Sequence, residues 1–280
     1  MSPTVKGLLL GLLGMGLFAV ADSTIKLLGD RYHAVQIVAF ASLFTLPLIA
    51  LMWLRTKGSL RPVHPWLMAI RTVALVGNAL LVTYAFTTLP LAQAYAIFFT
   101  APLVVTLAAW PLLGDRVGLV GGFAVLLGLV GVIVALNPGR AEFGLGHLAA
   151  TLGMLLAAVH YLIVRKTGGV ESGVAMLLYP VAAQCAAAFL LLPGRFVPMP
   201  LHDVATLASI SVTGMAGTLV MFAAYRTAPP VIVAPTQYSQ IAWAAIFGAL
   251  IFDEPMSAMT AVGMGIIAVA GLITVIRRDG

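Results

Sequence analysis

Long runs of apolar residues without any charge dominate the chain. Crossing the hydrocarbon core of a membrane takes about 20 helical residues, and seven uncharged runs reach or exceed that length. The run over 72–114 is too long for one helix and is expected to break at Pro90, because proline lacks an amide donor and disfavours helix before it. With two lightly charged runs added, the pattern predicts ten transmembrane helices: 5–28, 34–54, 66–88, 91–113, 117–136, 147–165, 173–192, 204–226, 231–252 and 256–276.

The first of these helices has an alternative interpretation. Lys6, the apolar run after it and the small triplet Ala19-Val20-Ala21 resemble a secretory signal with its cleavage site. However, Leu13-Gly14-Met15 recurs in the second half of the chain as Leu152-Gly153-Met154. Cleavage would remove most of a repeated element, so we interpret 5–28 as a membrane helix.

The spacing from Leu13 to Leu152, which we call the repeat offset, relates the two halves of the chain. It pairs Pro90 with Pro229, Phe99 with Tyr238, and Asp115 with Glu254. Each half then holds five helices, and an odd number inverts the second copy in the membrane. The predicted fold is an all-α membrane protein with two inverted five-helix repeats, residues 1–137 (helices 1–5) and 146–277 (helices 6–10). Inverted repeats are typical of transporters, although a structural or enzymatic membrane protein remains an alternative.

Composition and charge support the membrane assignment. Hydrophobic residues make up 61% of the chain and charged residues 9%, against about 25% charged in soluble domains. The single cysteine, Cys185, excludes an intrachain disulfide and a multi-cysteine metal site. The basic residues that give the net charge of +6 form no contiguous basic face, so we expect no nucleic-acid partner. With a cytoplasmic N-terminus, eleven Lys and Arg residues fall inside and four outside, which predicts that both termini are cytoplasmic.

Several motifs resemble a known family. The segments Ala69-Ile-Arg71, Tyr84 to Phe99, Leu113-Gly114-Asp115-Arg116 and Phe252-Asp253-Glu254-Pro255 are similar to those of EamA-type permeases in the drug/metabolite transporter superfamily. The resemblance covers two units, 5–137 and 146–277. It implies a ten-helix carrier of the bacterial inner membrane that exports amino acids or other small metabolites, or takes up compounds such as S-adenosylmethionine. Many relatives have an arginine in the second helix where this chain has Ala41, which disfavours an anionic substrate.

One face of the fourth predicted helix suggests a substrate site. Tyr95, Phe98 and Phe99 lie on that face, and the repeat maps it onto Gln237 and Tyr238, beside which lies Gln240. Aromatic faces can hold an apolar or cationic ligand group, and amides both donate and accept hydrogen bonds. We therefore expect the two faces to converge on a central cavity, with ordinary helix packing as the alternative.

Other polar residues inside the predicted helices are candidates for gating or coupling. Asp22 and Lys26 are four residues apart and could form an ion pair, either as a gate or as an anchor at the interface. Asn78 could line the cavity or hydrogen-bond across helices. His160 could relay protons or pack, and Tyr161 is the repeat equivalent of Asp22.

These observations favour a secondary transporter that moves a small organic molecule by alternating access. An amino acid or a similar zwitterion is the expected substrate; a multidrug or quaternary-amine exporter and an S-adenosylmethionine-type uptake carrier are alternatives. An intramembrane enzyme would need a catalytic set within the bilayer, but Asp22 and His160 are expected toward opposite faces. We expect no enzyme activity, cofactor or metal. A channel and a non-transporting scaffold are the remaining alternative functions, and the chain could be a monomer or a homodimer.

Overall fold

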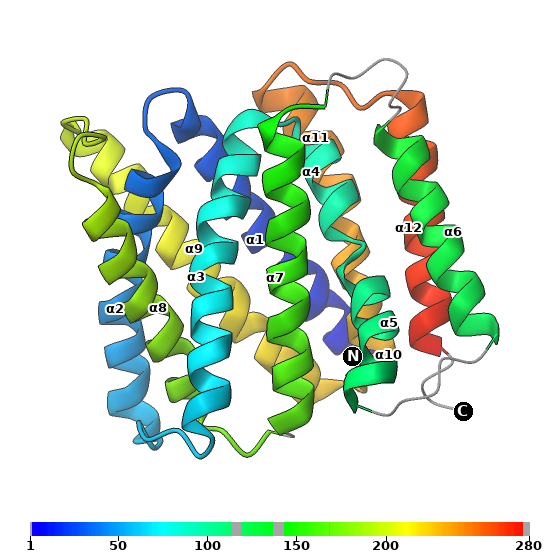
Figure 1. Cartoon of the computed structure of the whole chain (residues 1–280), viewed down its shortest axis with the longest axis horizontal. Coiled ribbons are helices and arrows are strands. Elements are labelled where there is room, and N and C mark those ends of the chain that lie inside the picture. The colour runs from blue at the N-terminus through cyan, green and yellow to red at the C-terminus, as the bar shows by residue number, and fades with distance from the viewer. Residues whose placement is uncertain (1, 114–118, 137–142, 168, 277–280) are drawn as a thin grey trace.

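The computed structural model describes residues 2–113, 119–136, 143–167 and 169–276, and these form a helical bundle without strands. The helix α1 (Pro3–Gly29) begins at the lower end of the bundle in Figure 1, and α12 (Ala258–Ile276) runs down to the same end. We use "lower end" and "upper end" in the sense of that view. The all-helical fold class expected from the sequence is therefore confirmed.

The helices agree with the expected segments to within a few residues. Between α1 and α12 they are α2 (Ala34–Thr56), α3 (Pro65–Thr88), α4 (Leu91–Phe98), α5 (Ala101–Leu113), α6 (Leu119–Leu136), α7 (Leu145–Thr167), α8 (Gly173–Leu191), α9 (Leu201–Thr227), α10 (Pro230–Val233), the 3-10 helix η1 (Ala234–Tyr238) and α11 (Ser239–Ile251). Seven described segments, one of which joins α4 and α5, are long and apolar enough to cross a membrane. The chain is thus a multi-pass membrane protein.

The fourth and ninth predicted helices are not continuous, which corrects the sequence-based expectation. The fourth is divided into α4 and α5 around Phe99 and Thr100, and the ninth into α10, η1 and α11. Pro102 and Pro235 follow the start of the new segment closely; each lacks an amide donor, and its ring crowds the carbonyl four residues earlier. Counted as two broken helices, these segments bring the described helical segments to ten.

Long-range packing pairs helices from the two halves of the chain. α1 packs along α9, α3 along α7, α2 along α8 and α6 along α12, and the last pair is visible at the right of Figure 1. Between α6 and α12 the backbones touch, because a Cβ atom on Gly263 would collide with the backbone nitrogen of Ala135. The Thr260 hydroxyl also donates to the Ala135 carbonyl over 3.1 Å. Small residues permit such close approach in membranes.

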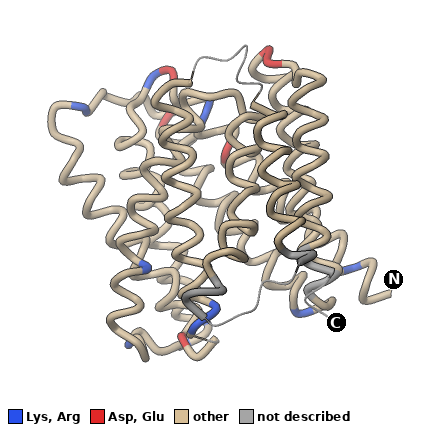
Figure 2. The backbone as a smooth tube through the Cα atoms, turned by 45° about the vertical axis from the view of Figure 1, so that its right-hand side comes forward, with Lys and Arg blue, Asp and Glu red and all other residues tan. Residues whose placement is uncertain are grey.

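Charged residues of the described chain gather near the two ends of the bundle (Figure 2). By their positions at the helix ends, eight Lys and Arg residues belong to the lower end: Lys6, Arg55, Lys57, Arg61, Arg71, Arg165, Lys166 and Arg226. Three belong to the upper end: Lys26, Arg31 and Arg195. Most described basic residues therefore lie on the side where α1 begins.

Candidate functional site

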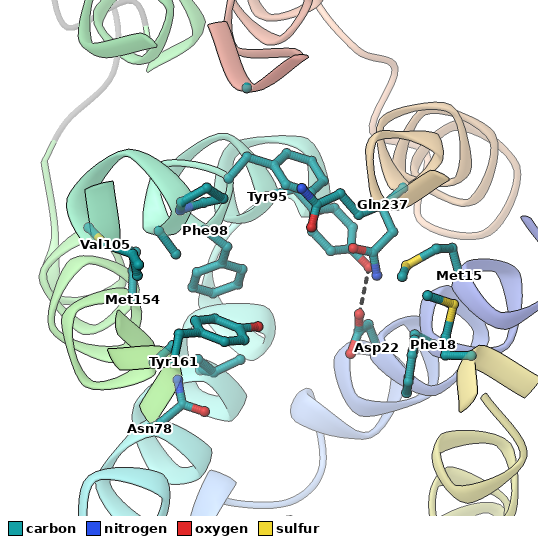
Figure 3. A pocket seen from close by; sticks show the side chains of 18 of the residues that line it. Met15, Phe18, Asp22, Asn78, Tyr95, Phe98, Val105, Met154, Tyr161 and Gln237 are labelled. Carbon is teal, nitrogen blue, oxygen red and sulfur yellow. Dashed lines mark hydrogen bonds between the residues drawn. The ribbon is translucent and has the colours of Figure 1, made fainter. Parts of the chain in front are cut away.

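A cavity of about 960 Å³ opens in the centre of the bundle. Its wall comes from both halves of the chain, mainly from α1, α3, α4, α5, α7 and α9, with η1, α11 and α12 adding one residue each. Figure 3 shows side chains from these elements facing a common space. The volume lies within the range of small-molecule sites, about 300–1,000 Å³.

The structure brings most of the expected substrate residues together at this cavity. Those that line it are Asn78, Tyr95, Phe98, Phe99, Gln237 and Gln240, and they are joined by the gating candidates Asp22 and Tyr161. The other three expected residues, Lys26, His160 and Tyr238, are not part of the lining. The breaks in the fourth and ninth helices are what bring Phe99 and Gln237 to the same space.

Asp22 has a different partner from the one expected. The Tyr95 hydroxyl donates to Asp22 Oδ2 over 2.6 Å (Figure 3). Lys26 Nζ instead lies 3.1 Å from Glu254 Oε1 and donates to the Leu89 carbonyl over 2.8 Å. The expected Asp22–Lys26 ion pair is therefore wrong. Lys26 lies one turn nearer the helix end, where the fold places a carboxylate from the α11–α12 loop.

Tyr238 lies behind the cavity wall. Its ring contacts that of Phe99 with 5.6 Å between centroids, and its phenol occupies the space where a side chain on Gly271 would stand. Phe99 in turn stacks on Tyr95, with 5.8 Å between centroids. Tyr238 thus packs behind the aromatic wall of the cavity. The 3-10 conformation of η1 directs the neighbouring Gln237, rather than Tyr238, toward the cavity.

Asn78 and His160 both make contacts between helices. Asn78 lines the cavity and also donates to the Gly153 carbonyl over 2.8 Å, so the two interpretations of this residue are compatible. His160 Nδ1 accepts a hydrogen bond from Arg71 Nε over 2.9 Å. Arg71 is 5% exposed and donates further to the Met176 carbonyl. His160 therefore helps to hold a buried guanidinium, which favours packing over a proton relay.

Some lining residues were missed by the sequence analysis. Met15, Met154 and Met221 contribute flexible thioether side chains, which adapt to varied ligand shapes. Methionine is common in apolar helices, so no pattern distinguished these three. Arg165 also lines the cavity, in the last turn of α7. It is the repeat equivalent of Lys26, and this relation was a signal that could have found it.

Polar contacts tie the elements together at the upper end of the bundle. Lys26 joins α1 to the α3–α4 turn and to the α11–α12 loop. The Tyr32 hydroxyl donates to Asp203 at the start of α9 over 2.5 Å, and its hydrogen bond with this carboxylate raises the pKa of Tyr32. In contrast, the cavity lining extends to Arg165 and Tyr225, near the lower ends of α7 and α9.

Within the described ranges, no group of three His, Cys, Asp or Glu residues is placed to hold a metal ion. The polar groups of the cavity wall are one carboxylate, one guanidinium, three amides, three phenols and one hydroxyl. This set can bind a small molecule through hydrogen bonds, charge and aromatic contact.

Apolar helices around a central cavity are an arrangement that membrane transporters use. Residues 5–137 match the EamA-like transporter family, and the relatives of the chain are EamA-type transporters of the drug/metabolite transporter superfamily. The resemblance inferred from the motifs is thereby confirmed.

Curated relatives match along nearly the whole chain. The S-adenosylmethionine uptake transporter of Rickettsia felis is 25% identical, over 91% of this chain and 87% of its own length. The pseudopaline exporter CntI of Pseudomonas aeruginosa is 26% identical, over 95% and 94%. Solute carrier family 35 member G1 of Mus musculus is 28% identical, over 97% and 78%. A solved crystal structure with 18% identity superposes with a TM-score of 0.68 over 98% of each chain, which concerns the fold alone.

Proposed function

We propose that the chain is a secondary transporter that moves a small zwitterionic metabolite, such as an amino acid, across the bacterial inner membrane. The observation that carries this proposal is the central cavity of about 960 Å³, which combines aromatic rings with the amides of Gln237 and Gln240. Tyr95, Phe98, Phe99 and Asn78 complete the proposed substrate contacts. No cofactor takes part.

Alternating access is supported by the difference between the two ends of the cavity. The contacts of Lys26 with Glu254 and Leu89 join three segments at the upper end, while the lining continues toward the lower end at Arg165. In the opposite state, the Lys26 contacts would separate and the lower end would close. We assign Lys26 and Glu254 to the upper gate.

The packing of the helices supports two inverted repeats, residues 1–137 and 146–277. By the repeat offset, α7 is the equivalent of α1 and α9 is the equivalent of α3. The packing of α1 on α9 and the packing of α7 on α3 are therefore equivalent contacts, and both are observed. Both broken helices also break around the equivalent residues Phe99 and Tyr238. Such repeats provide two related conformations around one site.

The proposed orientation places the lower end in the cytoplasm. Eight of the eleven described Lys and Arg residues lie at that end, and basic residues are enriched in cytoplasmic loops. Both termini would then be cytoplasmic, and the cavity would face inward.

A second candidate substrate is an organic cation, either a quaternary amine or an S-adenosylmethionine-type compound. The stacked rings of Tyr95 and Phe99 favour it, because aromatic faces attract cations. The name of the Rickettsia relative agrees with this candidate.

Transport by purified protein in liposomes tests the proposal. Counterflow of labelled amino acids, S-adenosylmethionine and quaternary amines should show uptake of at least one of these compounds. Gln237→Ala should lower the rate about tenfold, because one hydrogen bond to the substrate is lost. Gln184→Ala is the matched control, since Gln184 lies outside this cavity and donates to the Leu75 carbonyl. Equal rates in wild type and Gln237→Ala would contradict the site, and absence of any flux would contradict the function.

A further inference from the structure

Asp22 is the sole carboxylate among the described residues that line the cavity. It lies on α1, seven residues before the upper end of this helix. Figure 3 shows its side chain directed into the same space as Phe18 and Gln237. Its hydrogen-bond donor in the described structure is the Tyr95 hydroxyl, which is neutral and reaches one of the two carboxylate oxygens.

The nearest basic residue along α1 does not neutralise Asp22. Lys26 is engaged with Glu254, with the Leu89 carbonyl and with the Phe252 ring, 5.2 Å from its centroid. Arg165, the other charged residue of the described lining, lies in the last turn of α7 near the lower end. The cavity therefore has an acidic group deep inside and a basic group toward its lower end.

A carboxylate inside a membrane protein is costly unless a charge or several donors offset it. Among the described contacts, Asp22 has one neutral donor and no cation. The equivalent position in the other half is occupied by Tyr161, which also lines the cavity, so the acidic group is present on one side alone. A carboxylate with a single neutral donor, directed into a ligand-sized space, is suited to bind a positive charge.

We propose that Asp22 is the subsite that binds the positively charged group of the substrate, an ammonium or a sulfonium. This assignment rests on the proposed transport function and names the substrate class. The hydrogen bond from Tyr95 holds Asp22 Oδ2 and leaves the other oxygen for the ligand. The ring of Tyr95, stacked on Phe99, adds an aromatic face beside the carboxylate, and aromatic faces attract organic cations.

Three small probes that differ in charge can test this subsite. L-Phenylalanine has an ammonium and a carboxylate, phenethylamine has the ammonium alone, and 3-phenylpropanoate has the carboxylate alone. Their affinities for the purified full chain in detergent can be measured by calorimetry. The phenyl group is common to all three probes, so differences between them report the charged groups.

The expected result is a loss of affinity that depends on the ammonium. Asp22→Asn, which keeps the shape and can still accept from Tyr95, should weaken L-phenylalanine and phenethylamine about tenfold. It should leave 3-phenylpropanoate unchanged. Asp22→Glu should restore a preference for the amines, because it restores the charge. Asp30→Asn, at the exposed end of α1 and outside the cavity, is the control and should alter none of the three affinities.

Three outcomes would overturn the subsite: unchanged amine affinity in Asp22→Asn, equal weakening of all three probes, or no amine binding by the wild-type protein. Flux assays separate this failure from failure of the proposed function. Transport of phenethylamine at equal rates in wild type and Asp22→Asn would overturn the subsite while leaving a transporter. Charge-dependent amine binding without flux of any compound would support the subsite and overturn the transport function.

Discussion

The upper and lower ends of the bundle are built from similar helices but differ in how polar residues connect them. At the upper end, Lys26, Tyr32 and Gln36 reach residues that are far away in sequence. At the lower end, the contact of Glu171 with the backbone amides of Val63 and His64 joins two loops, whereas the contacts of Lys26 start from α1, the helix that also carries the cavity residue Asp22. Under the proposed alternating access, the upper end would therefore depend on a few polar contacts in addition to the apolar helix packing.

Removal of the Lys26 side chain should have the largest effect on this difference. Lys26→Ala deprives Glu254 of its cation and the Leu89 carbonyl of a donor, so the upper end should open. We expect transport to fall about tenfold or more, because an interaction with a charged group is lost from one of the two states.

Accessibility can be measured with a membrane-impermeant maleimide applied to the upper side. The reporter is Val82→Cys, a cavity residue, in a Cys185→Ala background. Labelling should increase when Lys26→Ala is added and stay unchanged with Lys6→Ala, an exposed residue at the start of α1. Labelling that does not respond to Lys26→Ala would show that other contacts close this end.

Gln36→Leu should weaken the upper end without altering charge. The Gln36 amide donates to the Val197 carbonyl over 2.7 Å and accepts from the Val197 amide over 2.9 Å, and the side chain is fully buried. Loss of both bonds should cost about 1–2 kcal/mol, measurable as reduced unfolding free energy in detergent. Gln93→Leu is the matched control, since Gln93 is half-buried and makes no hydrogen bond through its side chain among the described contacts. Equal loss in both variants would refute a specific role of Gln36.

The contact of Glu171 at the lower end should have the smallest effect, confined to acid pH. Burial acts to raise the pKa of Glu171, but the amides of Val63 and His64 and the His64 ring together lower it below its ordinary value of 4.5. A carboxylate whose pKa is lower in the folded state than in the unfolded state stabilises the folded protein at pH values above its unfolded-state pKa. This stabilisation is lost as the pH falls through the folded-state pKa. The link should therefore be complete at neutral pH and lost in acid, below about pH 4.5.

Hydrogen exchange can follow this link directly. Protection factors of the Val63 and His64 amides should fall in acid in the wild-type protein. Glu171→Gln should show reduced protection at neutral pH and little further change in acid. Protection that is independent of pH in the wild type would contradict the assigned role of Glu171.

Much of the fold followed from local properties of the chain. The limits of the long helices were predictable because each must hold about 20 apolar residues, and charges or Pro90 mark their ends. The breaks at Phe99 and within η1 were not predicted, since Pro102 and Pro235 could equally have produced bends. Pro47 and Pro180 do lie inside continuous helices, so proline alone does not decide the outcome.

The candidate site was predictable in part. The helical face of Tyr95, Phe98 and Phe99 and its repeat equivalent pointed to residues that line the cavity. Tyr238 differs because η1 has a 3-10 conformation, which rotates its side chains relative to an α-helix. The spacing of Asp22 and Lys26 suggested a pair, but neither the carboxylate of Glu254 nor the hydroxyl of Tyr95 could be placed from spacing along one helix.

The sequence by itself predicted that the chain spans a membrane and how many helical segments it has, because burial in hydrocarbon acts on each segment separately. Its short motifs indicated the family. The tertiary structure decided the two helix breaks, the partners of Asp22 and Lys26, and which residues line the cavity. These features depend on competition between groups that lie in opposite halves of the chain, such as Lys26 and Glu254. Only the packed bundle brings such groups within a few ångströms of each other.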